Sequence, residues 1–138
     1  MRKLIIASHG RLSEGFVSSL NLIVGKQNDI ECICAYETDN NIEFEIKKVI
    51  EQNNNNDLII ITDLLGGSVN NYLLNYSRRN NVYLIAGANL ALILEIVCNY
   101  QNCQKIDEMI KNAVEQAKKT IVYCDDNFIN NLGDLSDF

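Results

Sequence analysis

Short apolar runs rich in β-branched residues alternate with longer helical patterns along most of this 138-residue chain. The runs cover residues 3–8, 30–36, 57–63 and 82–87. The third run contains "LIIIT", which is apolar without alternation and is typical of a strand covered on both faces in a parallel sheet. Strict alternation of strand and helix predicts one α/β domain with a doubly wound, mainly parallel sheet flanked by helices.

Helical spacing of apolar residues fills the connections between these runs. Gly25 follows the first helical pattern as a C-terminal stop, and Asn40 with Glu43 resembles a capping box before the second. The apolar positions that carry the helical period are Leu12, Phe16, Leu20 and Ile23; Ile42, Ile46, Val49 and Ile50; Leu73, Leu74 and Tyr76; Ile93, Ile96 and Val97; and Ile106, Met109, Ile110, Ala113 and Ala117.

The C-terminal region divides into a short apolar segment and a polar end. "TIVYC" (120–124) predicts a further short strand, which closes a domain over residues 1–124. Residues 125–138 form an acidic, Asn-rich tail that fits either a flexible end or a connection to a further domain. No apolar segment approaches the roughly 20 residues of a membrane span, and the apolar start is too short for a signal peptide. A cytoplasmic protein is therefore expected.

Charge and cysteine content exclude several classes of function. The net charge of −6 argues against nucleic acid and leaves room for a basic protein partner. Five scattered cysteines predict free thiols in a reducing compartment, and four of them lie in or beside apolar segments, which predicts burial: Cys32, Cys34, Cys98 and Cys124. No paired Cys-x-x-Cys hooks occur and there is a single histidine, so we expect no structural metal site.

Chemically versatile residues follow three of the predicted strands. Ligands of open parallel sheets bind beyond the carboxyl ends of the strands. The first strand ends at Ser8-His9-Gly10, the third at Asp63 before "LLGGSVNN", and the fourth at Gly87-Ala88-Asn89. His9 is the only histidine in the chain. We therefore expect an imidazole, a carboxylate and a glycine-rich turn to meet in one crevice.

This combination suits the handling of a phosphoryl group. A carboxylate that accepts the N–H of the His9 ring would fix the tautomer and make the other nitrogen a better nucleophile. The turn at Gly66-Gly67 would let backbone N–H groups approach closely, and Ser68 would add a hydroxyl, either as helix N-cap or as a phosphate ligand. Each feature alone is common in proteins of other function, so their shared position is what favours this interpretation.

Three segments carry a resemblance to a known family: "IIASHGRLSEGF", "IITDLLGGSVNN" and "AGANLALILE". In order and spacing they resemble signature regions of the IIA component of the mannose/fructose/sorbose family of the bacterial phosphoenolpyruvate-dependent sugar phosphotransferase system. The resemblance covers roughly residues 1–124 and implies a flavodoxin-like fold. It implies a phosphotransferase in which His9 accepts a phosphoryl group on Nε2 from the histidine-containing phosphocarrier protein and passes it to a IIB component for sugar uptake.

The resemblance also implies roles for neighbouring residues and for partners. Asp63 would hold the other ring nitrogen, and the phosphoryl-binding residues would be Gly10, Gly66, Gly67 and Ser68. No metal, nucleotide or other cofactor is implied. A homodimer would exchange the strand at 120–124, and the IIB component would link the chain peripherally to a membrane permease. The chain departs from the family pattern in having no proline, with Val69 and Ala91 at the usual proline positions.

Other functions remain open at this point. "SHGR" resembles the start of phosphatases and mutases that need a second histidine, which this chain lacks. A receiver-like signalling domain phosphorylated on Asp63 would need an acidic pair after the first strand to bind magnesium, where this chain has Ser8-His9. A regulatory IIA-like domain associated with a dihydroxyacetone kinase would share the same residues. In each phosphocarrier case, Leu12, Leu64 and Leu65 are expected to be exposed for docking a protein partner.

Overall fold

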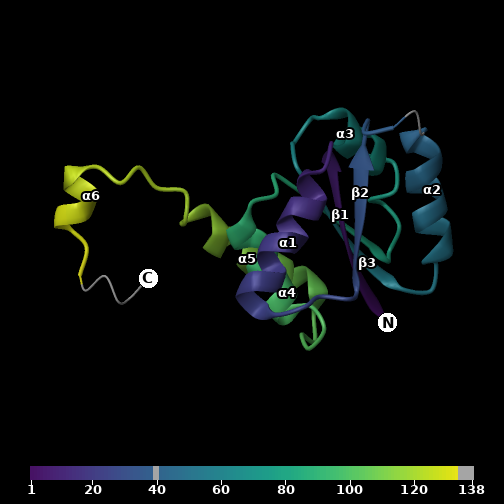
Figure 1. The fold of residues 1–138 in the computed structure, drawn as a ribbon. Coiled ribbons are helices and arrows are strands. Elements are labelled where there is room, and N and C mark those ends of the chain that lie inside the picture. Colours follow the sequence, from purple (N-terminus) through teal and green to yellow (C-terminus); the bar gives the residue numbers. More distant parts are fainter. Residues whose placement is uncertain (39–40, 134–138) are drawn as a thin grey trace.

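A computed structural model describes residues 1–38 and 41–133 (Figure 1). Its elements in chain order are β1 (Arg2–His9), α1 (Leu12–Val24), β2 (Ile30–Ala35), α2 (Ile42–Gln52), β3 (Asp57–Thr62), α3 (Ser68–Leu74), β4 (Val82–Ala86), α4 (Leu90–Asn99), α5 (Ile106–Lys118) and α6 (Asp126–Asn130). The four strands form one parallel sheet in the order β2-β1-β3-β4. The predicted doubly wound α/β fold is confirmed.

The direction of winding reverses at β1. The chain moves from β1 through α1 to β2 on one side, then crosses back through α2 to β3 on the other side. The carboxyl ends of β1 and β3 therefore flank a topological switch point, where the crevice of such sheets forms. Ala7 pairs with Thr62 in the last register position of these two strands. The next residues along each strand are thus brought together at the carboxyl edge of the sheet.

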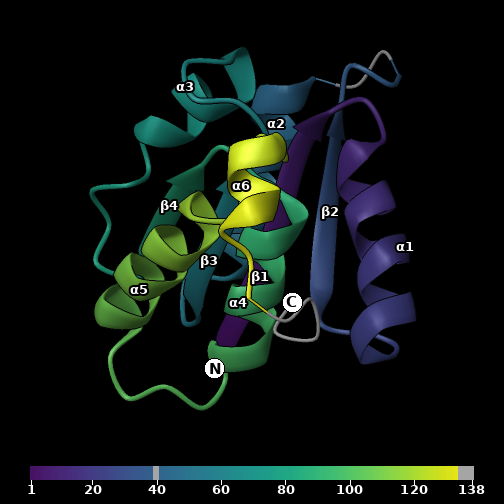
Figure 2. The ribbon, with the colours of Figure 1, turned by 90° about the vertical axis from the view of Figure 1, so that its left-hand side faces the viewer.

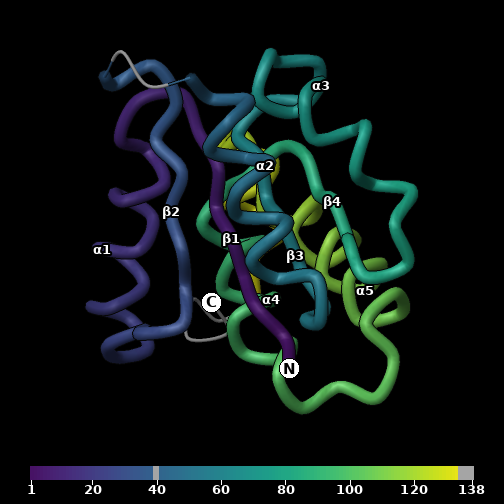
Figure 3. Tube along the Cα trace, turned by 90° about the vertical axis from the view of Figure 1, so that its right-hand side faces the viewer, coloured from purple at the N-terminus to yellow at the C-terminus, as the bar shows by residue number. Residues whose placement is uncertain are grey.

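Helices cover both faces of the sheet, as Figures 2 and 3 show from opposite sides. Side chains of β1 alternate between two cores, because successive residues of a strand point to opposite faces. Leu4 and Ile6 pack with residues of α1, α4 and α5, whereas Ile5 and Ala7 pack with residues of α2 and α3. Both faces are therefore buried, which explains the lack of polar alternation in the central strands.

The helix ends follow local signals in the sequence. α1 ends at Gly25, whose φ of 85° is a left-handed value that favours glycine, as predicted. The N-cap of α2 is Asn41, whose Oδ1 accepts the N–H of Glu43 at 3.0 Å. The predicted capping residue Asn40 lies outside the described residues. Within those residues, no helix combines the length and the apolar composition of a membrane span.

The C-terminal segment extends away from the α/β body toward α6 (Figure 1). The predicted strand over 120–124 does not form in the single chain, where residues 121–125 have no regular secondary structure. Ile121 and Tyr123 are 77% and 83% exposed. Part of the predicted tail is helical, since the side chain of Asp125 caps α6 by accepting the N–H of Phe128 at 2.8 Å. Residues 134–138 of that tail lie outside the described part of the chain.

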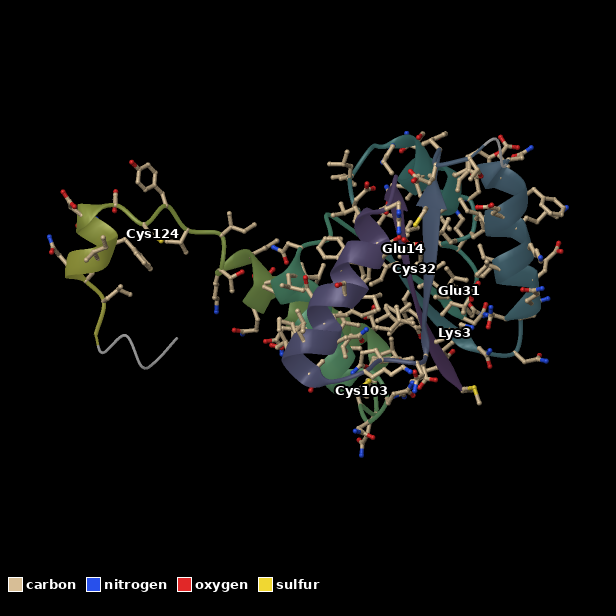
Figure 4. All side chains as sticks on the ribbon, in the orientation of Figure 1. Lys3, Glu14, Glu31, Cys32, Cys103 and Cys124 are labelled. Carbon is tan, nitrogen blue, oxygen red and sulfur yellow. The ribbon has the colours of Figure 1, made fainter. Side chains whose placement is uncertain are left out.

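All five cysteines are free, but the prediction that four are buried is wrong. Cys32 and Cys34 are half-buried because β2 is an edge strand of the sheet. Cys98 and Cys124 are exposed, the latter on the protruding segment (Figure 4). An apolar neighbourhood in the sequence therefore did not decide burial, because burial depends on what packs against each element.

Candidate functional site

The turn after β1 holds His9 at the switch point. Gly10 has a φ of 57°, a left-handed value that suits glycine, and its N–H donates to the Ala35 carbonyl at 2.8 Å. Ser8 Oγ accepts the N–H of Ser13 at 2.8 Å and donates to the Gly10 carbonyl at 3.2 Å. These bonds tie the turn to both α1 and β2. The backbone of His9 is thus anchored on each side.

Asp63 follows β3 and binds His9 through one carboxylate oxygen. Its Oδ2 accepts the backbone N–H of His9 at 2.8 Å and lies 3.0 Å from Nδ1 of the ring. Its Oδ1 accepts the N–H of Leu64 at 3.0 Å. The side chain of Asp63 is 9% exposed, and that of His9 is 40% exposed. The ring is therefore held from its inner edge while its outer edge reaches solvent.

The charge of Asp63 decides the tautomer of the ring. Burial raises the pKa of Asp63, but hydrogen bonds from the backbone N–H and ring of His9 and from Leu64 outweigh burial and hold that pKa below its ordinary value. Asp63 is thus a carboxylate at neutral pH and only accepts hydrogen bonds. Nδ1 of His9 must carry the proton that Asp63 accepts. In the neutral ring the lone pair then lies on Nε2, the nitrogen available for nucleophilic attack.

A glycine turn leaves room for this ring. A Cβ added to Gly67 would lie 3.2 Å from His9 Cε1 and 3.3 Å from Leu64 Cβ. Gly66 has a φ of 77°, and its carbonyl accepts a hydrogen bond from Asn71 Nδ2 at 3.2 Å. The close approach to His9 therefore depends on the missing side chain of Gly67, and the turn itself depends on Gly66.

Helix α3 begins directly after this turn, at the same end of the sheet as the carboxyl ends of the strands (Figures 1 and 3). Gly67 is the N-cap and Ser68 the first helical residue, so the predicted alternative of Ser68 as N-cap is not observed. Val69 stands at the first position where the family pattern usually has proline, and it is fully buried. The buried Thr62 hydroxyl donates to Asn70 Oδ1 at 2.8 Å, which ties α3 to the end of β3.

Two hydroxyl groups line the Nε2 edge of His9. Ser68 Oγ lies 3.5 Å from Nε2, and the Tyr36 hydroxyl lies 2.6 Å from Ser68 Oγ. The rings of Tyr36 and His9 have centroids 5.6 Å apart and are tilted by 34°. Tyr36 has a φ of 65° and is the one non-glycine residue among those described with a positive φ. That conformation costs on the order of 1 kcal/mol for a bulky residue.

Tyr36 is absent from the site residues predicted from sequence. It directly follows β2, so the rule that ligands bind beyond strand ends applies to it as well. Applying that rule to all four strands would have singled it out. Its closeness to His9 depends on the pairing of β2 with β1, which the sheet order decides.

The residues that follow β4 hold neighbouring elements in place. Asn89 Oδ1 accepts the N–H of Leu92 at 2.8 Å and so caps α4. The N–H groups of Gly87 and Ala88 donate to the Thr62 carbonyl at 3.0 and 2.9 Å, which joins the ends of β4 and β3. None of the contacts described for these residues reaches His9. Within the described part of the chain, no three His, Cys, Asp or Glu side chains gather as metal ligands.

Comparison with known proteins identifies the family. Residues 3–115 match the family model described as the PTS system fructose IIA component, where PTS is the phosphoenolpyruvate-dependent sugar phosphotransferase system. The chain belongs to this family. It is accordingly a transferase component of sugar transport, in agreement with the predicted resemblance. No curated protein matches the chain significantly.

Solved structures agree with the family. A candidate PTS permease from Klebsiella pneumoniae is 33% identical, with a TM-score of 0.86 over 91% of this chain and 93% of that one. Phosphotransferase system component EIIA from Streptococcus agalactiae is 26% identical, with a TM-score of 0.76 over 89% and 97%. The mannose/sorbose-specific IIA subunit from Enterococcus faecalis is 23% identical, with a TM-score of 0.76 over 97% and 98%, and supports the shared fold.

Proposed function

We propose that this IIA component carries a phosphoryl group on Nε2 of His9. The donor is the histidine-containing phosphocarrier protein, and the acceptor is a IIB component linked to a membrane permease. The observation that carries the proposal is the contact of Asp63 Oδ2 with Nδ1 at 3.0 Å, while the His9 side chain as a whole is 40% exposed. The ring can therefore react at Nε2 and keep its orientation.

The transfer step balances without a co-reactant. The Nε2 lone pair attacks phosphorus, the Nε2–P bond forms, and the bond to the donor nitrogen breaks with its electron pair returning to the donor ring. The His9 ring gains positive charge and keeps its proton on Nδ1. The Asp63 carboxylate, 3.0 Å away, stabilises that charge. Attack by the IIB nucleophile on phosphorus then breaks the Nε2–P bond and restores the neutral ring.

The phosphoryl oxygens would be bound by the turn that starts α3. The first N–H groups of a helix have no partner within the helix, so those from Ser68 onward suit an anion. Gly67 would act by leaving room, since its own N–H donates to the Leu64 carbonyl at 3.3 Å. Ser68 Oγ, 3.5 Å from Nε2, lies within reach of an oxygen on the attached phosphorus. Gly66 would contribute the shape of the turn. Gly10 would also act through turn shape, since its N–H is engaged by the Ala35 carbonyl at 2.8 Å.

Protein partners would dock on exposed leucines around this turn. Leu12, Leu64 and Leu65 are 48%, 59% and 81% exposed, as expected from sequence. Isolated exposed apolar residues are ordinary, but three of them in or next to the turns that follow His9 and Asp63 favour a docking surface. The net charge of −6 suits a basic partner. A homodimer formed through residues 120–124 is also part of this proposal.

The test is phosphorylation by the complete relay. The protein would be incubated with phosphoenolpyruvate, the kinase that charges the phosphocarrier protein, and the phosphocarrier protein itself. An acid-labile phosphoryl group should appear, with one phosphohistidine signal in phosphorus NMR. His9→Ala should abolish it, whereas Ser77→Ala, after the end of α3, should label like the unchanged protein. Equal labelling of His9→Ala, or alkali-labile labelling of Asp63 that needs magnesium, would overturn the proposal.

A further inference from the structure

We propose that Tyr36 is a positioning residue for phosphoryl transfer, acting through the hydroxyl of Ser68. This inference rests on the proposed function of His9. The Tyr36 hydroxyl lies 2.6 Å from Ser68 Oγ, and Ser68 Oγ lies 3.5 Å from His9 Nε2. The first contact is a short hydrogen bond and the second lies at the long limit of one. Tyr36 therefore holds Ser68 more firmly than His9 does.

The protonation of the site sets the direction of these bonds. His9 Nδ1 donates to the Asp63 carboxylate, so Nε2 of the neutral ring has a lone pair and accepts. The single proton of the Ser68 hydroxyl is the donor that can face it. The Ser68 oxygen must then accept from Tyr36. Donors run in one direction, from Tyr36 through Ser68 and His9 to Asp63.

This direction prepares Ser68 for the phosphoryl group. Tyr36 occupies an acceptor side of the Ser68 oxygen and leaves the serine proton facing Nε2. Once Nε2 is bonded to phosphorus, the same proton can turn to a phosphoryl oxygen without losing the bond from Tyr36. A donor oriented before the reaction stabilises developing charge without rearranging during the step. Without Tyr36, the Ser68 hydroxyl would populate several rotamers and would also donate its proton to water.

The backbone of Tyr36 supports a role for its side chain. Its φ of 65° is a conformation that glycine and asparagine adopt more readily than tyrosine. Strained residues at a site point to a function of that residue. From the end of β2, the tyrosine reaches past the end of β1 to the start of α3, with its ring 5.6 Å from that of His9. A smaller residue with easier backbone geometry could not make this bridge.

A double-mutant cycle tests the route through Ser68. Tyr36→Phe removes only the hydroxyl and should slow phosphoryl transfer to His9 about fivefold to tenfold. Ser68→Ala should slow it about 100-fold. The double variant should match Ser68→Ala, because Tyr36 then has nothing to orient. Tyr76→Phe is the control, since that ring packs under Arg79, 5.2 Å from its centroid, and should keep the full rate. Multiplicative effects of Tyr36→Phe and Ser68→Ala would overturn the inference.

A measurement of stability distinguishes a positioning role of Tyr36 from a merely structural one. Tyr36→Asn relieves the left-handed backbone and should leave the melting temperature unchanged or raise it by about 3 °C. Transfer should nevertheless slow at least as much as in Tyr36→Phe. If the rate instead stays at the level of the unchanged protein, Tyr36 does not position the reaction.

One measurement stays valid even if His9 proves not to carry phosphate. Because His9 is the only histidine, the nitrogen NMR spectrum of the ring-labelled protein contains a single imidazole. In Tyr36→Phe, the Nε2 resonance should move toward that of an unbonded nitrogen, while Nδ1 stays in place beside Asp63. Failure of the relay to label the unchanged protein would remove the proposed function alone. An Nε2 resonance that does not move would remove the role of Tyr36.

Discussion

Asp63 Oδ2 binds both the backbone N–H of His9, at 2.8 Å, and Nδ1 of the same residue, at 3.0 Å. Because His9 makes both hydrogen bonds to the same Asp63 oxygen, the orientation of its ring is fixed relative to its own backbone. The carboxylate comes from β3 and the histidine from β1, so the pair also joins the two strands at the switch point. Any change in this carboxylate should affect both chemistry and stability.

Asp63→Asn should slow phosphoryl transfer to His9 by at least about 100-fold. The neutral amide cannot stabilise a positive ring, and its NH₂ group can face the ring and select the wrong tautomer. The measurement is the rate of labelling by the charged phosphocarrier protein under rapid quench. Asp57→Asn, at the opposite end of the same strand, is the matched control and should keep the rate of the unchanged protein. A near-normal rate for Asp63→Asn would contradict a role of this charge.

The same carboxylate should make stability depend on pH. The pKa of Asp63 is lower in the folded protein than in an unfolded chain, so the unfolded chain binds the proton more readily. Its contribution is complete above the unfolded pKa and is lost as pH falls through the folded pKa. The difference in free energy of unfolding between the unchanged protein and Asp63→Asn should therefore shrink below about pH 4. Urea titrations followed by circular dichroism from pH 6 to pH 3 would measure this difference in free energy of unfolding. A difference that stays constant over this range would contradict a stabilising role of the Asp63 carboxylate.

Gly67→Ala should displace the His9 ring. The new Cβ would lie 3.2 Å from Cε1, closer than an ordinary contact, so the ring or the turn must shift by a few tenths of an ångström. We expect transfer to slow about tenfold, because the rate depends steeply on the position of the reacting atom. Gly15→Ala in α1 is the control, where a Cβ meets nothing within 4 Å. That control should gain about 1 kcal/mol of stability and keep its rate.

Leu65→Asp should weaken docking of the phosphocarrier protein. Leu65 is 81% exposed beside the glycine turn, and a charge there would disfavour an apolar contact. The concentration of donor that gives half-maximal rate should rise about tenfold. Leu22→Asp is the control, because Leu22 is 88% exposed near the far end of α1. Equal effects of the two substitutions would show that general surface charge, and not docking at this site, is responsible.

Residues 120–124 should be required for the homodimer. Ile121 and Tyr123 are 77% and 83% exposed in the single chain, and β4 has a free edge in the sheet. Light scattering should give twice the chain mass of 15.6 kDa for the full chain and for a chain that ends at residue 125. A chain that ends at residue 119 should be a monomer. If the full chain is a monomer at a concentration of tens of micromolar, the prediction of an exchanged strand is wrong.

Much of the sheet and part of the site could be predicted because they depend on local patterns. A strand buried on both faces must be apolar throughout, so the predicted run 57–63 differs by a single residue from β3 (Asp57–Thr62). The polar residue that ends such a run lies at the carboxyl edge. That rule brought His9 and Asp63 together without knowledge of the strand order.

Other features depend on neighbours that no local pattern specifies. Asp63 directly follows β3, whereas Asn89 comes after Gly87 and Ala88 beyond the end of β4, and its side chain caps α4. β4 is also separated from β1 by β3. Cys98 lies in an apolar stretch and is nevertheless exposed, whereas Ile93 and Ile96 of the same helix are buried in the core. The segment 121–125 has a strand-like sequence without a strand beside it in the single chain.

The sequence by itself determined the alternation of elements, the lone histidine and the acid that follows the third strand, because burial on two faces and the direction of parallel strands leave little choice. Only the tertiary structure decided that Tyr36 reaches Ser68. That contact needs β2 beside β1 and a left-handed backbone at the strand end. Both are properties of the packed sheet, whose free energy holds a tyrosine in a conformation that its own chain would avoid.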